Sequence, residues 1–404
     1  MPCTACRLKR MPEAACTADA GTGMPKAGSA AMYTGGLTMM IHEQKIDYPE
    51  NSPVKVTFLS VRNYSPHYHF DTIEIIYCFR GKVTIVSGFE TLTLSEGEYY
   101  TTSRRDIHSI RAASGTAEGA DSAAAAVSAA GTYSASDCED NIIMLVHLDL
   151  TASSVPYQYL KSVLFVFEAA GISDTSQSGA CLSGPNIYLS RMNDILMMLG
   201  LITTGGVQDK TLHISADELL SQTADNLIDL LFNHFSYANY AAQRPEIPEN
   251  IREISLAMSG YIGTHYTEKI SLSTFAESLH FSKTHLASLM KNNLNLTFNE
   301  SLNYMRCLQA EHLLLTTDKP NPDISNECGF SDTKYFYANF KKWYGRTPLQ
   351  HKEWYEELCK APDDYEEIPP AQLRSFIEEY YCRYHSRKTI DYIIGKNAPE
   401  SAAE

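Results

Sequence analysis

The sequence predicts a multidomain α+β protein, and three observations support this. Segments rich in Val, Ile, Tyr and Phe follow one another between residues 54 and 150, which is typical of β-strands. Two helix-turn-helix patterns stand in tandem between residues 272 and 344. Between these regions the apolar spacing is helical. The strands are expected at 55–61, 73–79, 82–86 and 142–148, and the intervening helices at 157–170, 187–202 and 215–235.

Composition divides the 404 residues into five parts. Residues 1–38 are rich in Ala, Gly, Thr and Pro and lack periodicity, so we expect a disordered extension. A β domain is expected over 39–155, a helical linker region over 156–245, and an all-α domain over 246–355. The remaining 356–404 form a C-terminal extension, in which a helix is expected to pack back on the domain.

A flexible insertion is expected within the β region. Residues 112–139 contain 11 Ala, 5 Ser and 3 Gly, a composition that supplies neither a strand nor a core. Lengthening a loop costs little closure entropy. We therefore expect this segment to be dispensable for stability. Residues 241–250, with two prolines and no periodicity, are expected to form the linker to the all-α domain.

The second helix-turn-helix pattern spans residues 324–348. A short helix leads into Gly329, which suits the positive φ of a tight turn, and Phe330 fills the corner. Ser331 is the expected N-cap of the next helix. We expect that helix to bury Phe336, Phe340 and Trp343 and to turn Thr333, Lys334 and Tyr337 outward.

The first pattern has the same design, with Ser282 as the expected cap of its second helix. Leu286, Leu289 and Met290 form the expected buried stripe, and the opposite face is left exposed. A helix from about 297 to 315 joins the two patterns, and Thr297 and Glu300 have the spacing of a capping box. At 1.5 Å per residue this helix is about 28 Å long.

Charge is unevenly distributed along the chain. The net charge is -15, but residues 250–355 hold 11 Lys and Arg against 10 Asp and Glu, which is a net +1. The acidic remainder opposes non-specific binding to nucleic acid. The ten cysteines are scattered, and Cys3-Thr-Ala-Cys6 has no matching second pair, so neither a disulfide scaffold nor a zinc ribbon is expected. No membrane span or secretory signal is expected, and a reducing cytoplasm fits the composition.

Residues 251–354 resemble the AraC/XylS family of bacterial transcription regulators. The resemblance depends on Phe275-Ala276-Glu277, Phe281-Ser282, Gly329-Phe330-Ser331-Asp332, Phe340-Lys341-Lys342 and Thr347-Pro348. It implies two recognition helices in successive major grooves of double-stranded DNA and contact with RNA polymerase if the protein is an activator. It also implies a homodimer, with the helical region 156–245 as the dimerisation region. Ser288 and Ala338 depart from the larger or basic residues often found in the family. The positions that align with the family's DNA-facing residues are Lys283, Thr284, Ala287, Ser288, Thr333, Lys334, Tyr335 and Ala338; packing in the core is the alternative for Tyr335.

The β region carries a second constellation, formed by His67, His69, Glu74 and His108. With Gly81, it resembles the first motif of the cupin barrel, while the second motif is degraded. The resemblance implies that residues 39–155 form a cupin-like sensor barrel. Period-two spacing places His67 and His69 on one face of a strand. In regulators of the resembled family such a domain often binds a small molecule, frequently a sugar and usually without metal. We therefore expect an effector site with no catalytic residues, no cofactor and no metal.

Other interpretations of this cluster remain open. The four side chains could be polar residues satisfied by their neighbours, in a barrel that only dimerises. Three imidazoles and a carboxylate could also hold Fe, Mn, Zn or Ni. In that case the protein would be a metal-dependent cupin enzyme with an accessory helical domain, and metal content would distinguish it from a sensor.

Overall fold

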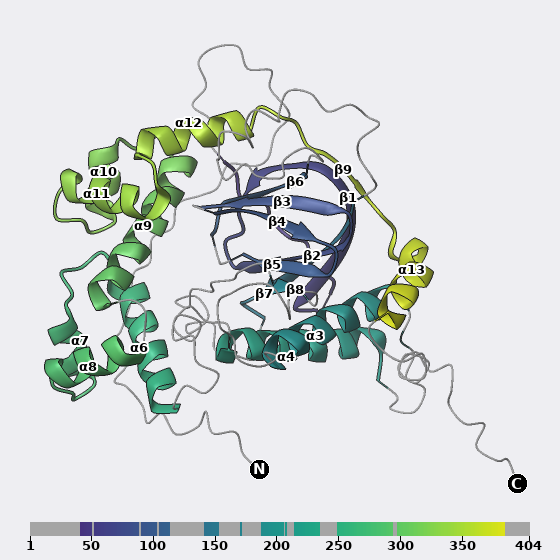
Figure 1. Ribbon diagram of the computed structural model, residues 1–404, viewed down its shortest axis with the longest axis horizontal. Helices are drawn as coiled ribbons and strands as arrows, with labels where there is room; N and C mark the ends of the chain where they lie inside the picture. The colour runs from purple at the N-terminus through teal and green to yellow at the C-terminus, as the bar shows by residue number, and fades with distance from the viewer. Residues whose placement is uncertain are drawn as a thin grey trace, which may run out of the picture. The chain divides into compact units, whose positions relative to one another are not determined.

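The computed structural model describes residues 41–383, apart from 51, 89, 103–104, 114–140, 153–169, 172–186, 206, 208–213, 235–248 and 294–296. Within these residues it contains an antiparallel β-barrel, helices packed on the barrel, and a helical domain (Figure 1). The predictions for 1–38, for 157–169, for most of the 112–139 insertion and for most of the 241–250 linker lie outside the described residues.

The barrel sheet has the strand order β4-β3-β6-β1-β7-β2-β5-β8, with antiparallel neighbours throughout. The four expected strands are present, as β1, β2, β3 and β7. Strands β4, β5 and β6 were not predicted from the sequence, because these short strands mix apolar residues with Thr, Ser, Glu and His. The strands are β1 (Val54–His67), β2 (Thr72–Arg80), β3 (Lys82–Ser87), β4 (Glu90–Ser95), β5 (Glu98–Thr101), β6 (His108–Ala112), β7 (Ile142–Asp149) and β8 (Ala170–Gly171).

Both faces of the central strands are buried, which explains their nearly continuous apolar sequence. In β2, Ile73, Ile75 and Tyr77 belong to a core shared with helices, whereas Ile76 and Cys78 belong to a second core on the opposite face. Strand β7 alternates in the same way. Since side chains alternate along a strand, a polar residue between the helix-facing positions must lie on the second face.

Helices α3 (Ile187–Thr203) and α4 (Ala216–His234) pack against each other and against the barrel. They confirm the helices expected at 187–202 and 215–235, whereas Ala170, the last residue of the helix expected at 157–170, lies in β8. Leu196, Leu199 and Leu227 are fully buried in the core that these helices share with β2 and β7.

The C-terminal extension returns to the barrel. Strand β9 (Asp364–Glu367) pairs with β1, with Leu59 opposite Glu367 and Asn63 opposite Asp364. Helix α13 (Pro370–Cys382) then packs against the core that contains α3, so the expected helix is present (Figure 1). The strand was not expected, because all four of its residues are exposed and it joins the sheet through its backbone.

The helical domain comprises seven helices within the described residues, and α9 is common to its two cores. Phe298, Leu302 and Met305 of α9 lie in one core, and Ala310 and Leu314 lie in the other. The expected capping box of this helix, Thr297 with Glu300, is confirmed. The helices are α6 (Glu249–His265), α7 (Leu272–Ser278), α8 (Lys283–Asn293), α9 (Phe298–Thr316), α10 (Asn321–Glu327), α11 (Thr333–Tyr344) and α12 (Pro348–Leu358).

Among the helices that the structure describes, none is long and apolar enough to cross a membrane.

Helix α13 is expected to stabilise the barrel. Ile377 is 1% exposed and its side chain lies against Gly200 of α3. Ile377→Ala removes buried methyl groups and leaves a cavity, so we expect the free energy of unfolding to fall by about 2–5 kcal/mol. Chemical denaturation monitored by circular dichroism measures this change. Glu379→Ala, at an exposed position on the same helix, is the control, and equal stability of the two variants would contradict the packing role.

Candidate functional site

The first helix-turn-helix unit consists of α7 and α8. The turn between them contains His280 with a φ of 57°, and Ser282 caps α8 by accepting a hydrogen bond from the His285 amide at 3.2 Å. The expected cap is therefore confirmed. Leu286 and Met290 are buried in the core. The opposite face of α8 presents Lys283, Thr284 and Ser288, which are exposed, and Ala287, which is half-buried.

In the second unit, α10 and α11, the turn requires glycine for two reasons. Gly329 has a φ of 78°, a conformation that residues with a side chain rarely adopt. A Cβ atom at this position would also lie 2.7 Å from the Thr267 Cα and from the Tyr266 carbonyl oxygen. The second turn thus packs directly on the loop that precedes α7.

The cap of α11 differs from the expected one. Asp332, not Ser331, is the N-cap, and its carboxylate accepts a hydrogen bond from the Tyr335 amide at 2.7 Å. A carboxylate at a helix N-terminus also interacts favourably with the helix dipole, which the Ser331 hydroxyl would do only weakly. The helix therefore begins one residue later than a Ser331 cap would place it.

The buried stripe of α11 also differs in one residue. Phe336 and Phe340 are fully buried as expected, but Tyr344, one turn further on, completes the stripe. Trp343 is only half-buried, because spacings of four carry the stripe past it. Tyr337 does not face outward as expected, since it packs beside this core and its hydroxyl accepts a hydrogen bond from Asn321 at 2.7 Å.

The exposed face of α11 carries the remaining predicted contact residues. Lys334, Tyr335 and Ala338 are exposed and Thr333 is half-buried. Tyr335 is 42% exposed. It is therefore not packed in the core, which was the alternative interpretation of this residue. Its hydroxyl accepts a hydrogen bond from Asn303 of α9 at 2.8 Å, which fixes the ring at the surface.

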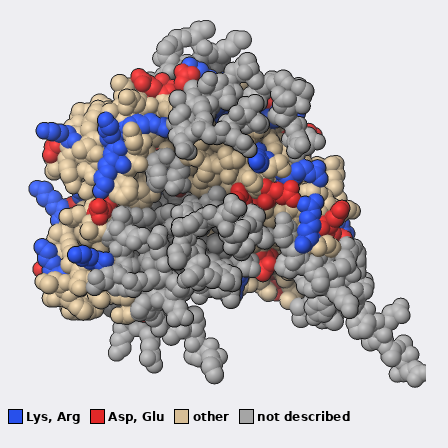
Figure 2. Space-filling model, viewed as in Figure 1, with Lys and Arg blue, Asp and Glu red and all other residues tan. Residues whose placement is uncertain are grey.

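The two helix-turn-helix units are held together by α9. Arg306, near the middle of this helix, donates hydrogen bonds to the carbonyl oxygens of Tyr266 at 2.7 Å and Glu268 at 2.8 Å. These bonds fix the loop on which the Gly329 turn rests. Figure 2 shows several Lys and Arg side chains on the side of the molecule where Figure 1 places α8 and α11.

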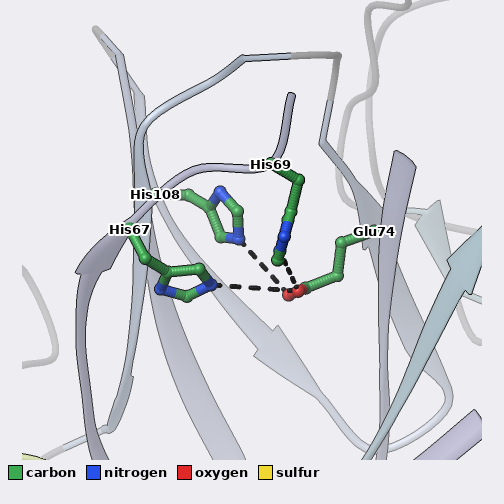
Figure 3. Close-up of side chains that lie close together, drawn as sticks. All are labelled: His67, His69, Glu74 and His108. Atoms are coloured by element: carbon green, nitrogen blue, oxygen red, sulfur yellow. Dashed lines mark hydrogen bonds and ion pairs between the residues drawn. The ribbon is translucent and has the colours of Figure 1, made fainter. Parts of the chain in front are cut away.

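The second candidate site is a buried cluster of side chains, drawn in Figure 3. It lies on the face of the barrel sheet opposite the core that β2 and β7 share with α3 and α4. It contains His67 at the end of β1, His69 just beyond it, Glu74 in β2 and His108 at the start of β6. One ligand atom from each residue lies within 4.8 Å of the other three. The structure therefore brings together all four residues that the sequence singled out.

A fourth histidine, His147 of β7, joins the cluster and was missed in the sequence. It is paired in register with Glu74, and its Nε2 lies 2.8 Å from Glu74 Oε2. His69 Nε2 lies 2.9 Å from the same oxygen. His108 Nε2 is 3.3 Å from Glu74 Oε1, without the alignment of a hydrogen bond. The carboxylate is thus surrounded by imidazoles.

Burial and mutual contact shift the titration of these groups. Burial by itself would raise the pKa of Glu74, but His108, His147 and His67 around the carboxylate outweigh it and hold the pKa well below the usual range. Burial, with the nearby His67, lowers the pKa of His108 to about 4. Burial also lowers the pKa of His147. For His69, burial opposes protonation, but the hydrogen bond to Glu74 prevails and raises the pKa.

Comparison with known proteins gives one family-model match and partial matches to curated regulators. A family model described as a helix-turn-helix domain matches residues 275–353. The HTH-type transcriptional activator RhaS of Enterobacter sp. (strain 638) is 29% identical over 96 residues, which are 24% of this chain and 34% of RhaS. The lactose operon transcription activator of Staphylococcus xylosus is 34% identical over 84 residues, which are 21% of this chain and 30% of the activator.

Among solved structures, the chain is similar to the C-terminal domain of the two-component response regulator yesN from Fusobacterium nucleatum subsp. nucleatum. The identity is 34%, with 26% of this chain and 99% of that domain covered and a TM-score of 0.24. It also matches ToxT from Vibrio cholerae O395, at 10% identity over 76% of this chain and 99% of ToxT, with a TM-score of 0.34.

The C-terminal domain is therefore a double helix-turn-helix domain of the kind that binds DNA. It is a domain of the AraC family, here preceded by a β-barrel domain. The chain spans about a third of the length of the curated regulators cited above.

Proposed function

We propose that this protein is a DNA-binding transcription regulator whose barrel senses a small molecule. The observation that carries the proposal is the pair of exposed recognition helices on a single connecting helix. At 1.5 Å per residue, α9 is about 28 Å long. One turn of B-DNA is about 34 Å. A connecting helix of this length suits two helices that enter successive major grooves on one side of the duplex.

The proposed DNA contacts follow from which residues are accessible on each recognition helix. On α11, Lys334 is exposed near the N-terminus, where side chains of a recognition helix reach base edges. On α8, Thr284 occupies the corresponding exposed turn. The full proposed set is Lys283, Thr284, Ala287 and Ser288 on α8, and Thr333, Lys334, Tyr335 and Ala338 on α11.

The proposed sensor site is the cluster of His67, His69, Glu74 and His108. Buried polar groups that converge in a barrel supply the hydrogen bonds that fix the orientation of a small ligand. A carbohydrate is the class of effector that the family resemblance favours. The effector would shift the population of DNA-binding states only by its differential affinity for them. The relatives are named as transcription regulators, which favours this proposal over a metal-dependent enzyme.

The proposed partners follow from the same role. The target is promoter or operator DNA in the cytoplasm, and an activator would also contact RNA polymerase. We propose a homodimer formed through the region of α3 and α4. The buried faces of these helices are occupied by the barrel core, so a partner would meet the exposed side of α4, which carries Asp217, Glu218 and Gln222.

Lys334→Ala tests the DNA-binding role. If Lys334 reads a base, we expect operator binding to weaken by about 1–3 kcal/mol, mainly for sequences with the correct base. If it contacts a phosphate, all sequences should bind more weakly. The slope of the logarithm of the binding constant against the logarithm of the salt concentration should then fall in magnitude by about one. Fluorescence anisotropy with a selected operator measures both. Thr284→Ala should give a smaller loss, and Lys360→Ala, an exposed lysine beyond α12, is the control. Unchanged binding by Lys334→Ala would remove this residue from the interface.

His69→Ala tests the sensor role. The substitution removes a buried hydrogen-bonding group from the barrel, whereas the recognition helices belong to separate cores. We expect the variant to fold and to bind DNA like the wild type, but to lose thermal stabilisation by any sugar, from a panel of mono- and disaccharides, that stabilises the wild type. A sugar that stabilises both proteins equally would show that the cluster is not its binding site.

A further inference from the structure

The segment that follows α12 is bound to the barrel by hydrogen bonds. We call this segment, residues 359–367, the strap. The side-chain amide of Asn63 in β1 donates to the carbonyl oxygens of Ala361 at 3.2 Å and Pro362 at 2.7 Å. The Ser65 hydroxyl donates to the Ala361 carbonyl oxygen at 3.2 Å. The end of the strap, β9, pairs with the same strand. The strap is thus fixed to the part of the barrel that leads into the polar cluster.

One side chain of the strap is connected to the polar cluster through a buried ring. The ring centroids of Tyr365 and Tyr64 lie 4.6 Å apart. The Tyr64 ring in turn stacks on the His67 ring, with the centroids 4.6 Å apart and the planes at 29°. Tyr64 is buried, whereas Tyr365 is exposed. A ligand that moves His67 would therefore act on Tyr64, and through it on the strap.

The other end of the strap continues directly from α12, which is itself docked on the barrel. The Tyr355 hydroxyl donates a hydrogen bond to the Ile107 carbonyl oxygen at 3.1 Å. The guanidinium of Arg111 donates to the Leu358 carbonyl oxygen at 2.7 Å. Tyr355 and Leu358 also share an apolar cluster with Ile107, which directly precedes His108 in the chain. The strap and α12 are thus attached to two segments that carry histidines of the polar cluster.

Helix α12 holds the C-terminal half of the recognition helix α11. The ring of His351 in α12 lies 5.5 Å from the Phe340 ring and 4.8 Å from the Tyr344 ring, between centroids. Its Nε2 is 2.7 Å from Glu311 Oε1 of α9, and the Tyr344 hydroxyl donates to Glu311 Oε2 at 2.8 Å. These side chains are all buried. Because polar groups in a protein interior need their partners, α12 cannot shift without disturbing α11.

This attachment involves the second helix-turn-helix unit and leaves its recognition face open. Within the described residues, no hydrogen bond or ring contact of the strap reaches α7 or α8. Lys334, Tyr335 and Ala338 of α11 remain exposed. The strap therefore does not act by covering the surface that would meet DNA, and its effect must come through the position of the second unit.

We propose that the strap couples the barrel site to the second helix-turn-helix unit. In the docked state, the barrel, the strap and α12 form one body. Displacement of Tyr64 loosens the strap, and α12 with it. An effector would shift the balance between docked and loosened states only by its differential affinity for them. The regulatory meaning of this coupling rests on the proposed function, whereas the coupling itself belongs to the protein without DNA or effector.

Hydrogen exchange of the full-length protein, followed by mass spectrometry, tests the coupling. The double variant Asn63→Ala, Tyr365→Ala removes both attachments of the strap. Its α12 amides should exchange at least about fivefold faster, the lower end of ordinary coupling between sites, with α8 unchanged. Tyr365→Phe keeps the ring and should exchange like the parent. Arg62→Ala, which breaks only the exposed ion pair with Asp364, is the matched control and should also behave like the parent.

A further substitution tests whether the barrel site acts through the strap. Tyr64→Leu keeps an apolar side chain in the barrel core but removes the ring between His67 and Tyr365. In the parent it should speed exchange in α12. In the double variant it should add little, because residues that act through one another have non-additive effects. A purely structural role of Tyr64 would give equal effects in both backgrounds.

Three results would overturn the proposal. They are unchanged exchange in α12 of the double variant, equal acceleration in α8 and α12, and equal effects of Tyr64→Leu in the two backgrounds. Circular dichroism checks that each variant is folded, and Tyr365→Ala alone, at an exposed position, replaces the double variant if that one does not fold. Operator binding by the same proteins is measured separately. A parent that binds no DNA would overturn the proposed regulator but not the coupling, and the reverse also holds.

Discussion

The arrangement of the helical domain depends on one shared helix. The N-terminal half of α9 is part of the first core and its C-terminal half is part of the second, so neither helix-turn-helix unit can form its core without it. Arg306 and Gly329 add direct contacts to the same loop, at 266–268. A rigid element between two recognition helices fixes their separation, and that separation determines which DNA spacing can be read by both.

The barrel uses its two faces for different purposes. One face of β2 and β7 packs on α3, α4 and α13, and the other collects polar side chains from β6, β1, β7 and β2, four neighbouring strands of the sheet. The cluster is enclosed, because His67, His69, Glu74, His108 and His147 are all buried. The chain then continues through the DNA-binding domain and returns to the barrel as β9 and α13. The DNA-binding domain is thus flanked in sequence by two segments that belong to the barrel side of the protein.

The features of the fold that could be predicted from the sequence are those in which one residue type satisfies a local requirement. Gly329 was identified because a tight turn needs a positive φ, although its close contact with the loop before α7 depends on tertiary structure. The cap of α11 was misassigned because Ser331 and Asp332 are both good caps and only the fold decides between them. His147 was missed because it follows Glu74 by 73 residues, and only strand pairing brings them together. A polar residue at an inward position of an apolar strand was the available signal. Strand β9 gave no apolar signal at all, since it pairs through its backbone.

The central claim is that two recognition helices on one connecting helix read a specific DNA sequence. Selection of bound duplexes from a random-sequence library by the purified full-length protein tests it most directly. The account predicts enrichment of two short elements whose centres lie about one helical turn, roughly 10–10.5 base pairs, apart. Bound duplexes with no enriched sequence, or with one short element and no preferred partner spacing, would contradict it.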